Sequence, residues 1–312
     1  MHAHLWTAGY LDRLERLGKS DTATQRGIGA DATDADLEAR FALMDRAGID
    51  LQVLSTAPQS PHLPAESDAV ALAEAANDSY AELVARFPDR FLAFAALPLP
   101  HVDAALSELT RALDELGAVG VGVTTTVLGR TLADPLFGPL YEELDRRGAV
   151  LYVHPCRRGR GQPADHRARH DMDGRGAGRG HGGDHAPDPR GPSRALSTDA
   201  RPGVAPGRGT AAAAPPLDDH LAFESPGTPE PPSVAARRLW YDTVSHAHPP
   251  ALVAAVASFG ADHIVLGTDF PYEDGEVFLR AVDHIADSGL GPEEVTMILD
   301  TNAADLLGLS AP

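Results

Sequence analysis

Residues 149–154 read Ala-Val-Leu-Tyr-Val-His, an apolar run that ends in a histidine. A short run of this kind, without polar alternation, is typical of a parallel strand that is buried on both faces. Similar runs occur at residues 51–56, 91–98, 119–126, 239–244 and 263–269. Helical patterns lie between the runs, at residues 34–47, 66–87, 102–116, 134–147, 250–259, 276–288 and 292–307. The repeated order of strand and helix predicts an α/β fold with a parallel sheet.

We predict that this sheet closes into a (β/α)8 TIM-type barrel. The glycines of residues 117–122 lie at the start of a strand, so they do not form the glycine-rich loop of a dinucleotide-binding fold. The chain has 312 residues, and such barrels commonly need about 250. Because eight strands are required, we expect one further strand at the N-terminus and another within residues 157–216.

Residues 157–216 have a composition unlike that of the rest of the chain. They contain 11 Arg, 12 Gly and 8 Pro, but no Glu and few large apolar residues. Their 11 arginines and 6 aspartates give a charge of +5, whereas the rest of the chain carries −24. Because the segment has little to bury, we expect it to be disordered. The barrel is then incomplete: this stretch replaces about strand 6, between an N-terminal part (1–156) and a C-terminal part (217–312) of one barrel.

The composition also excludes several classes of protein. The net charge is −19, which disfavours binding to nucleic acid or to an anionic membrane surface. No apolar run approaches the ~18 residues of a membrane span, and the first twenty residues lack the order of a secretory signal. Cys156 is the only cysteine, so no intramolecular disulfide can form. A cytoplasmic location is therefore expected.

Three predicted strand ends carry residues that could bind a metal ion. His2 and His4 are spaced so that both imidazoles lie on one face of a strand. His154 ends the run quoted above, and Asp269 ends the run 263–269. The carboxyl ends of barrel strands meet at one mouth, where active sites lie. Three imidazoles and one carboxylate there predict a Zn²⁺ site, or a site for another divalent metal.

Several motifs, taken in order, resemble those of one enzyme family. They are His-Ala-His (2–4), Phe-Pro-Asp-Arg-Phe (87–91), Ala-Leu-Pro-Leu-Pro (96–100), Leu-Gly-Ala-Val-Gly-Val (116–121), Val-His-Pro (153–155), Gly-Thr-Asp-Phe-Pro (267–271) and Asn-Ala-Ala-Asp-Leu-Leu-Gly (302–308). They are similar to the amidohydrolase superfamily, in its amidohydrolase-related branch that includes aminocarboxymuconate-semialdehyde decarboxylase. The resemblance covers residues 1–156 and about 217–312.

This resemblance implies a metal-dependent barrel enzyme with His2, His4, His154 and Asp269 as metal ligands. It favours a non-oxidative decarboxylase, a carboxy-lyase acting on a small carboxylated molecule. One alternative is a hydrolase of a small lactone, amide or ester, in which Asp269 takes up the proton as catalytic residue. The other is an inactive scaffold with residues 157–216 as a basic interaction arm. The oligomeric state is left open, with a homodimer as one compatible assembly.

The family also has a catalytic histidine in a Ser-His-Leu-Gly-Gly-like motif after the sixth strand, which this sequence lacks. Codons for residues 204–209, read from their second base, allow that motif. We therefore interpret residues 157–216 as a local frame error, with a natural basic linker as the alternative, and expect activity to be impaired. We do not expect a substitute catalytic role for the histidines of this segment, His166, His170, His181 and His185.

Other residues near the predicted mouth are weaker candidates. Trp6 follows the His-Ala-His motif and could line a substrate pocket, although a core role fits equally well. Asp242 could shape the mouth or cap the loop that follows it. We expect four further polar residues to be solvated: Arg237, Arg238, His246 and His248.

Overall fold

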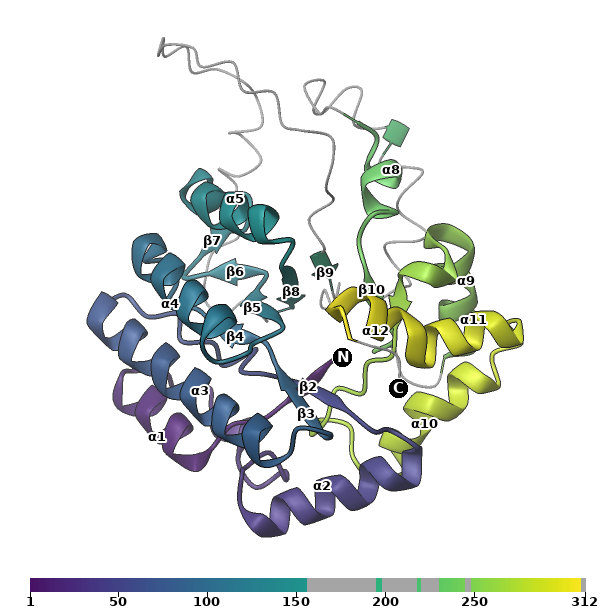
Figure 1. The fold of residues 1–312 in the computed structure, drawn as a ribbon, viewed down its shortest axis with the longest axis horizontal. Helices are drawn as coiled ribbons and strands as arrows, with labels where there is room; N and C mark the ends of the chain where they lie inside the picture. The colour runs from purple at the N-terminus through teal and green to yellow at the C-terminus, as the bar shows by residue number, and fades with distance from the viewer. Residues whose placement is uncertain (156–194, 198–217, 220–229, 245–247, 310–312) are drawn as a thin grey trace.

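The computed structural model describes residues 1–155, 195–197, 218–219, 230–244 and 248–309 (Figure 1). Its strands are β1 (Ala3–His4), β2 (Gln52–Ser55), β3 (Phe91–Ala93), β4 (Ala95–Ala96), β5 (Gly120–Thr124), β8 (Val150–His154), β9 (Ala195–Ser197), β10 (Tyr241–Asp242) and β11 (Ile264–Val265), with a small hairpin of β6 (Thr126–Val127) and β7 (Arg130–Thr131). All strands except the hairpin pair in parallel. The predicted parallel sheet is therefore confirmed.

The strands form a closed ring. The parallel order runs β1-β2-β3, continues through β4-β5-β8-β9, and ends with β10-β11. Phe94 alone separates β3 from β4, so these two strands are one position of the ring. β10 lies beside β9, and the backbone N–H of His4 donates to the carbonyl of Phe270 at 2.7 Å, just after β11. Eight strand positions therefore stand in the order of the predicted TIM-type barrel, with β9 and β10 in contact but not paired in one sheet. β9 occupies the sixth position, which was expected to be replaced.

The strand at the sixth position comes from the segment that was expected to be disordered. β9 pairs with β8 through Leu151↔Ala195, Tyr152↔Leu196 and Val153↔Ser197. The strand expected within residues 157–216 is thus present at Ala195–Ser197. The prediction of disorder is wrong at these three residues, because the ladder of β8 can hold a strand through backbone hydrogen bonds alone. The rest of residues 157–216, and with it the proposed frame error, lies outside the described residues.

Helices cover the outside of the ring (Figure 1). They are α1 (Ala8–Arg16), α2 (Asp34–Ala47), α3 (Glu66–Arg86), α4 (Val102–Asp114), α5 (Gly138–Arg147), α8 (Pro232–Ala236), α9 (Pro249–Phe259), α10 (Gly275–Ala286), α11 (Pro292–Thr296) and α12 (Asn302–Leu307), with 3₁₀ turns η1 (Ala23–Gln25), η2 (Pro135–Phe137) and η3 (Ala261–His263) and one π-helical turn, η4 (Met297–Thr301). Among the described residues, no helix has both the length and the apolar character needed to cross a membrane.

Helix α2 shows how the sequence sets these boundaries. Thr33 precedes the helix, and its side chain accepts a hydrogen bond from the backbone of Asp36, so one free N–H group of the first turn is satisfied. The helix ends at Gly48, whose φ of 68° lies in the left-handed region that favours glycine. Buried Leu37 and Met44 turn one face of α2 towards the strands.

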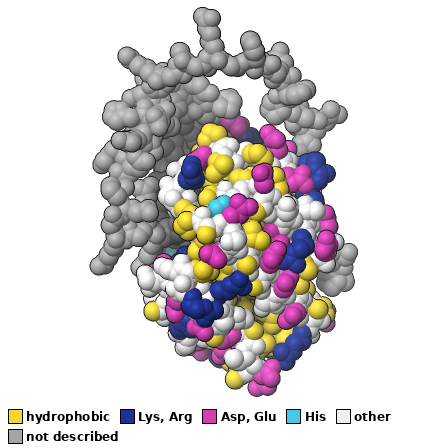
Figure 2. All heavy atoms as spheres, turned by 90° about the vertical axis from the view of Figure 1, so that its left-hand side faces the viewer, with side chains coloured by type: hydrophobic (Ala, Val, Ile, Leu, Met, Phe, Trp, Pro, Cys, Tyr) yellow, Lys and Arg dark blue, Asp and Glu magenta, His cyan; other side chains and the backbone are white. Residues whose placement is uncertain are grey.

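The outer faces of neighbouring helices are tied by ion pairs. Arg147 of α5 pairs with Asp114 of α4 at 2.7 Å, and Arg111 of α4 pairs with Asp78 of α3 at 2.7 Å. On the face shown in Figure 2, acidic side chains are scattered with arginines between them.

Candidate metal centre

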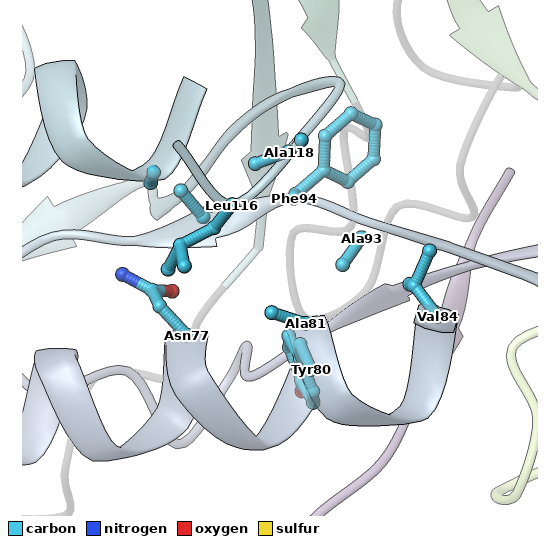
Figure 3. A pocket seen from close by; sticks show the side chains of 11 residues that line it. Asn77, Tyr80, Ala81, Val84, Ala93, Phe94, Leu116 and Ala118 are labelled. Atoms are coloured by element: carbon cyan, nitrogen blue, oxygen red, sulfur yellow. The ribbon is translucent and has the colours of Figure 1, made fainter. Parts of the chain in front are cut away.

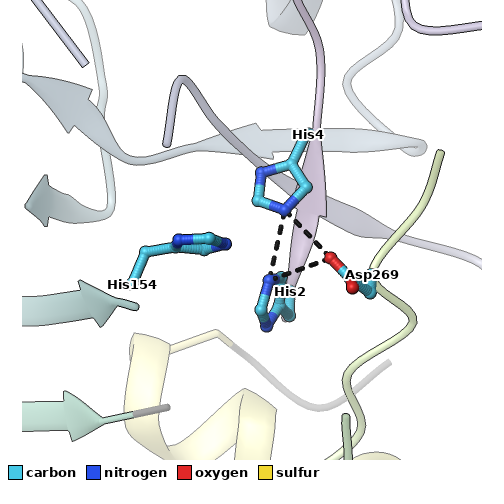
Figure 4. A group of neighbouring side chains, drawn as sticks. All are labelled: His2, His4, His154 and Asp269. Atoms are coloured by element: carbon cyan, nitrogen blue, oxygen red, sulfur yellow. Dashed lines mark hydrogen bonds and ion pairs between the residues drawn. The ribbon is translucent and has the colours of Figure 1, made fainter. Parts of the chain in front are cut away.

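The structure brings His2, His4, His154 and Asp269 together at one mouth of the barrel (Figure 4). One ligand atom from each lies within 4.8 Å of the others. His2 directly precedes β1 and His4 ends it, His154 ends β8, and Asp269 lies in the loop after β11. The sequence-based prediction that these four side chains converge agrees with this geometry.

His2 is oriented by a carboxylate from β10, which lies beyond β11 in the ring. Its Nδ1 lies 2.8 Å from Oδ2 of Asp242, and both side chains are buried. The carboxylate accepts the Nδ1 proton, so Nε2 is the nitrogen that a metal would bind once its own proton is displaced. Burial lowers the pKa of His2, but Asp242 and Asp269 outweigh it and raise the pKa to about 9.

Asp242 can approach His2 because Gly267 has no side chain. A Cβ atom at Gly267 would lie 2.6 Å from Cγ2 of Val244 and 3.0 Å from Cβ of Asp242. The other oxygen of Asp242, Oδ1, accepts a hydrogen bond from the backbone N–H of Val244 at 3.0 Å. Asp242 therefore caps the following loop, which was one of its two roles predicted from the sequence. It also orients His2, a predicted metal ligand.

His4 and Asp269 face the same point as His2. Nε2 of His4 lies 3.2 Å from Nε2 of His2 and 3.2 Å from Oδ1 of Asp269. Oδ1 of Asp269 is also 3.3 Å from Nε2 of His2. Burial lowers the pKa of His4. Burial acts to raise the pKa of Asp269, but His2 and His4 hold it below the usual range.

His154 completes the group from the opposite side (Figure 4). Its Nδ1 lies 2.6 Å from the carbonyl oxygen of Pro155, so Nδ1 carries the proton and Nε2 carries the lone pair. Burial, and then the charges of His4 and His2, lower the pKa of His154 well below its ordinary value. A neutral imidazole is the form that binds metal.

The backbone at Asp269 is held in an uncommon conformation. Its φ is 53°, in the left-handed region, which aspartate tolerates better than most residues. The backbone N–H of Asp269 donates to the carbonyl oxygen of His2 at 2.9 Å, and Thr268 donates to the same oxygen at 3.2 Å. These bonds to β1 fix the loop in the position that directs the carboxylate at His2 and His4.

The residues fit a divalent metal ion. Three imidazoles and one carboxylate form a donor set that suits Zn²⁺ and similar ions. The atoms that face one another are mainly acceptors, and their lone pairs repel unless a cation or a proton lies between them. The three imidazole side chains are buried, whereas the side chain of Asp269 is 23% exposed. Asp269 is therefore the member of the group that reaches the open side.

The structure shows where most of the weaker sequence-based candidates lie. Trp6 is buried and stacks on His4, with ring centroids 5.2 Å apart and an interplanar angle of 10°. Its Nε1 donates to the carbonyl oxygen of Thr56, so its substrate-binding role stays a prediction. Arg238 pairs with Glu230, and Arg237 is exposed. His248 precedes α9 and is partly buried, and His246 lies outside the described residues.

A pocket close to α3 is not part of this centre (Figure 3). It is lined by Asn77, Tyr80, Ala81 and Val84 of α3, together with residues of β3, β4, α4 and the loop 116–118. None of the four metal-site residues lines it. The buried amide of Asn77 holds the carbonyl and the N–H of Ala96, so its role is to fasten α3 to the barrel.

Comparison with known proteins agrees with this geometry. The family model described as Amidohydrolase matches residues 1–309. The chain belongs to the amidohydrolase family. The gamma-resorcylate decarboxylase of Rhizobium radiobacter is 31% identical over 282 residues, which are 80% of this amidohydrolase and 79% of that relative. The family resemblance inferred from the sequence is thus confirmed.

Other relatives cover different shares of the chain. The 2-amino-3-carboxymuconate-6-semialdehyde decarboxylase of Dictyostelium discoideum is 34% identical over 131 residues, but the match spans only 36% of its length. A crystal structure of 2,6-dihydroxybenzoate decarboxylase with 2,6-dihydroxybenzoate has a TM-score of 0.74 at 23% identity, over 99% of this amidohydrolase and 97% of that chain. The dihydroxybenzoic acid decarboxylase of Polaromonas, solved with manganese, has a TM-score of 0.75 at 21% identity. The match covers 98% of this amidohydrolase and 95% of that chain. At this identity the structural likeness shows the fold.

Proposed function

We propose that this amidohydrolase is a metal-dependent, non-oxidative decarboxylase of small aromatic carboxylates. The observation that carries the proposal is the group of His2, His4, His154 and Asp269, whose ligand atoms lie within 4.8 Å at the mouth of the barrel. The relatives support the substrate class, since the names of several end in decarboxylase and refer to hydroxylated benzoates. Zn²⁺ is our first choice of metal on the donor set, and Mn²⁺, which a structural neighbour contains, is the second.

In this proposal each residue of the site has a separate role. His2, His4, His154 and Asp269 hold the divalent cation, which when bound supplies positive charge for an anionic substrate. Asp242 keeps Nε2 of His2 directed into the site. Decarboxylation breaks the bond between the ring carbon and the carboxylate and forms a C–H bond in its place, so one proton must be delivered. The proton comes from solvent, and Asp269, an ionised carboxylate, is our candidate for relaying it to the ring carbon, because its side chain reaches the open side of the group.

The experiment measures CO₂ release from 2,6-dihydroxybenzoate by the purified chain, loaded in turn with Zn²⁺ and Mn²⁺. We expect release that a chelator abolishes and that Asp269→Asn lowers at least 100-fold. Asp262→Asn, an exposed carboxylate before β11, is the matched control and should retain full activity. Absence of CO₂ release from a panel of hydroxybenzoates by fully metal-loaded protein would contradict the proposal.

The alternatives give different readouts in the same assay. A hydrolase would open a lactone, amide or ester without releasing CO₂, with Asp269 taking the proton of the attacking water. A scaffold with a basic arm in residues 157–216 would do neither.

We propose that the chain forms a homodimer in the cytoplasm and does not bind nucleic acid. Light scattering of the purified chain measures the mass of the assembly and so tests the homodimer.

A further inference from the structure

A second cavity lies outside the ring of strands, between helices α1 and α3. The two helices lie side by side in Figure 1. Residues 5–7, which link β1 to α1, and Thr56, just after β2, complete its wall. Its volume is about 220 Å³, whereas a cavity of about 150 Å³ already holds a benzene ring. None of the four candidate metal ligands lines this cavity, so it is separate from the metal centre.

The wall of the cavity is mainly apolar. Its aromatic side chains, Trp6, Tyr10 and Tyr80, each donate to a main-chain carbonyl oxygen at 2.7 Å. These donors therefore need no partner inside the cavity, and the bonds hold the rings in place. Leu72 and Ala76 of α3 add further apolar surface. Such a wall suits the apolar body of a small molecule.

Arg13 of α1 brings the positive charge of its guanidinium to this cavity. It is half-buried, and its side chain forms no hydrogen bond or ion pair within the part of the chain that the structure describes. The hydroxyl of Ser79, from α3, has no hydrogen-bond partner there either. No carboxylate is among the described residues that line the cavity. A guanidinium binds a carboxylate through two parallel hydrogen bonds, so Arg13 favours an anionic ligand.

The rim of the cavity is open at Gly9, in the first turn of α1. A Cβ atom at this position would meet no heavy atom within 4 Å, and the φ of Gly9 is not in the left-handed region. Glycine weakens a helix relative to alanine, and neither packing nor backbone conformation in this chain requires it here. Space for a ligand accounts for a glycine at this rim.

We propose that this cavity is a second binding site, for a small organic carboxylate whose apolar body is about the size of one ring. The carboxylate binds the guanidinium of Arg13, and the body contacts Trp6, Tyr10 and Leu72. The site is formed by helices and not by the metal ligands, so it does not rest on the proposed function. Trp6 also stacks on His4, with ring centroids 5.2 Å apart, so a ligand here contacts a ring that packs against the metal centre.

The test measures binding of benzoate to the metal-free chain, with benzyl alcohol as the neutral probe of similar size. Trp6 and Trp240 are the two tryptophans, so Trp240→Phe leaves the fluorescence of Trp6 as the readout. We expect benzoate to bind at least tenfold more tightly than benzyl alcohol. Arg13→Gln should remove this difference, and Arg13→Lys should restore part of it. Arg16→Gln, at an exposed position in the last turn of α1, is the matched control.

Equal affinities of wild type for the two probes, no benzoate binding, or an unchanged benzoate affinity in Arg13→Gln would each overturn the proposal.

A second variant blocks the cavity without changing its charge. Gly9→Leu places a side chain in open space and suits a helix, so the chain should fold. We expect it to weaken binding of both probes at least tenfold. Ala254→Leu, at an exposed position of α9, is its control and should bind as wild type does. Unchanged affinities in Gly9→Leu would place the probes elsewhere and contradict the proposal. Neither readout needs metal or turnover, so the decarboxylase assay and this proposal can fail independently.

Discussion

At the scale of single residues, the hydrogen bond between Asp242 and His2 decides which imidazole nitrogen faces the other ligands. Removing such a carboxylate while the ligands stay in place typically lowers metal affinity 10- to 100-fold. We therefore expect Asp242→Asn to weaken Zn²⁺ binding by about that factor, measured by competition with a chromogenic chelator. Asp262→Asn should leave the affinity unchanged. Equal affinities for wild type and Asp242→Asn would show that His2 needs no orienting partner.

His62, a buried histidine in the loop between β2 and α3, gives a second prediction at this scale, on stability against pH. Its pKa is about 3 in the folded chain and about 6.5 when unfolded. The unfolded chain then binds the additional proton below pH 6.5. The stability that neutral His62 provides is therefore complete above that pH and is lost as pH falls towards 3. Between pH 7.5 and 5.5 the free energy of unfolding should fall by roughly 1 kcal/mol more in wild type than in His62→Gln.

Urea unfolding of the metal-free proteins at the two pH values measures this difference. His263→Gln, at the other end of the barrel, serves as the control for general effects of histidine replacement. The same loss of stability in wild type and in His62→Gln would show that His62 is protonated in the folded chain.

At the scale of elements, Arg40 fastens α2 to β1, the strand that ends in the candidate ligand His4. It is 1% exposed, its Nε donates to Oε1 of Gln52 at 2.7 Å, and its Nη2 donates to the carbonyl oxygen of His4 at 2.9 Å. Its guanidinium also lies 4.6 Å from the ring centroid of Phe270. Arg40→Ala leaves two buried acceptors without donors and opens a cavity, so it should destabilise the fold by about 3 kcal/mol.

Arg46 of the same helix is the matched comparison. It is exposed and forms an ion pair with Glu276 at 3.1 Å. Such surface pairs contribute ~0–1 kcal/mol, so Arg46→Ala should change the unfolding free energy by less than about 1 kcal/mol. Thermal or urea unfolding of both variants makes the comparison. Similar effects of the two substitutions would mean that burial of Arg40 contributes nothing specific.

Most elements could be predicted from sequence because their patterns are local. The run 149–154 contains β8 (Val150–His154), and the helical pattern 34–47 coincides with α2. Helix α1 was missed because it is short, with nine residues, and directly follows the metal motif. A strand was expected within residues 157–216, but its position could not be given, because β9 is held by pairing with β8, which composition cannot reveal. Tertiary contact thus decided the elements that pattern alone did not find.

The candidate site, too, could be predicted from the sequence only in part. Its four expected ligands could be found because each stands at or beside a strand end, and strand ends of a barrel converge. The role of Asp242 could not be found, because it depends on the register of β10 against β11 and on the missing Cβ of Gly267.

At the scale of the whole molecule, the ring is closed by hydrogen bonds between β1 and the loop after β11. This closure brings His2 and His4 into contact with Asp269, 265 residues further along the chain than His4. The catalytic histidine that the family resemblance implies is absent from the sequence, and residues 157–216 stand where it is expected. We therefore expect this chain to bind metal while its turnover is impaired.

Restoring the shifted reading frame across residues 157–216 tests that separation. A positioned acid or base contributes about 10²- to 10⁴-fold to a rate. We expect the restored protein to exceed the present chain in kcat by at least 100-fold, at equal metal content and with the same hydroxybenzoate. Equal kcat values would identify residues 157–216 as a natural part of a working enzyme.

Metal stoichiometry is the most direct test of the claim that His2, His4, His154 and Asp269 form one divalent metal site. The measurement is elemental mass spectrometry of the dialysed chain after loading with Zn²⁺, for wild type, His154→Ala and the control His101→Ala in the loop before α4. We predict one metal ion per chain in wild type and in the control, and less than about a tenth of that in His154→Ala. Equal metal content in His154→Ala and wild type would contradict it, because the ion would then be bound elsewhere.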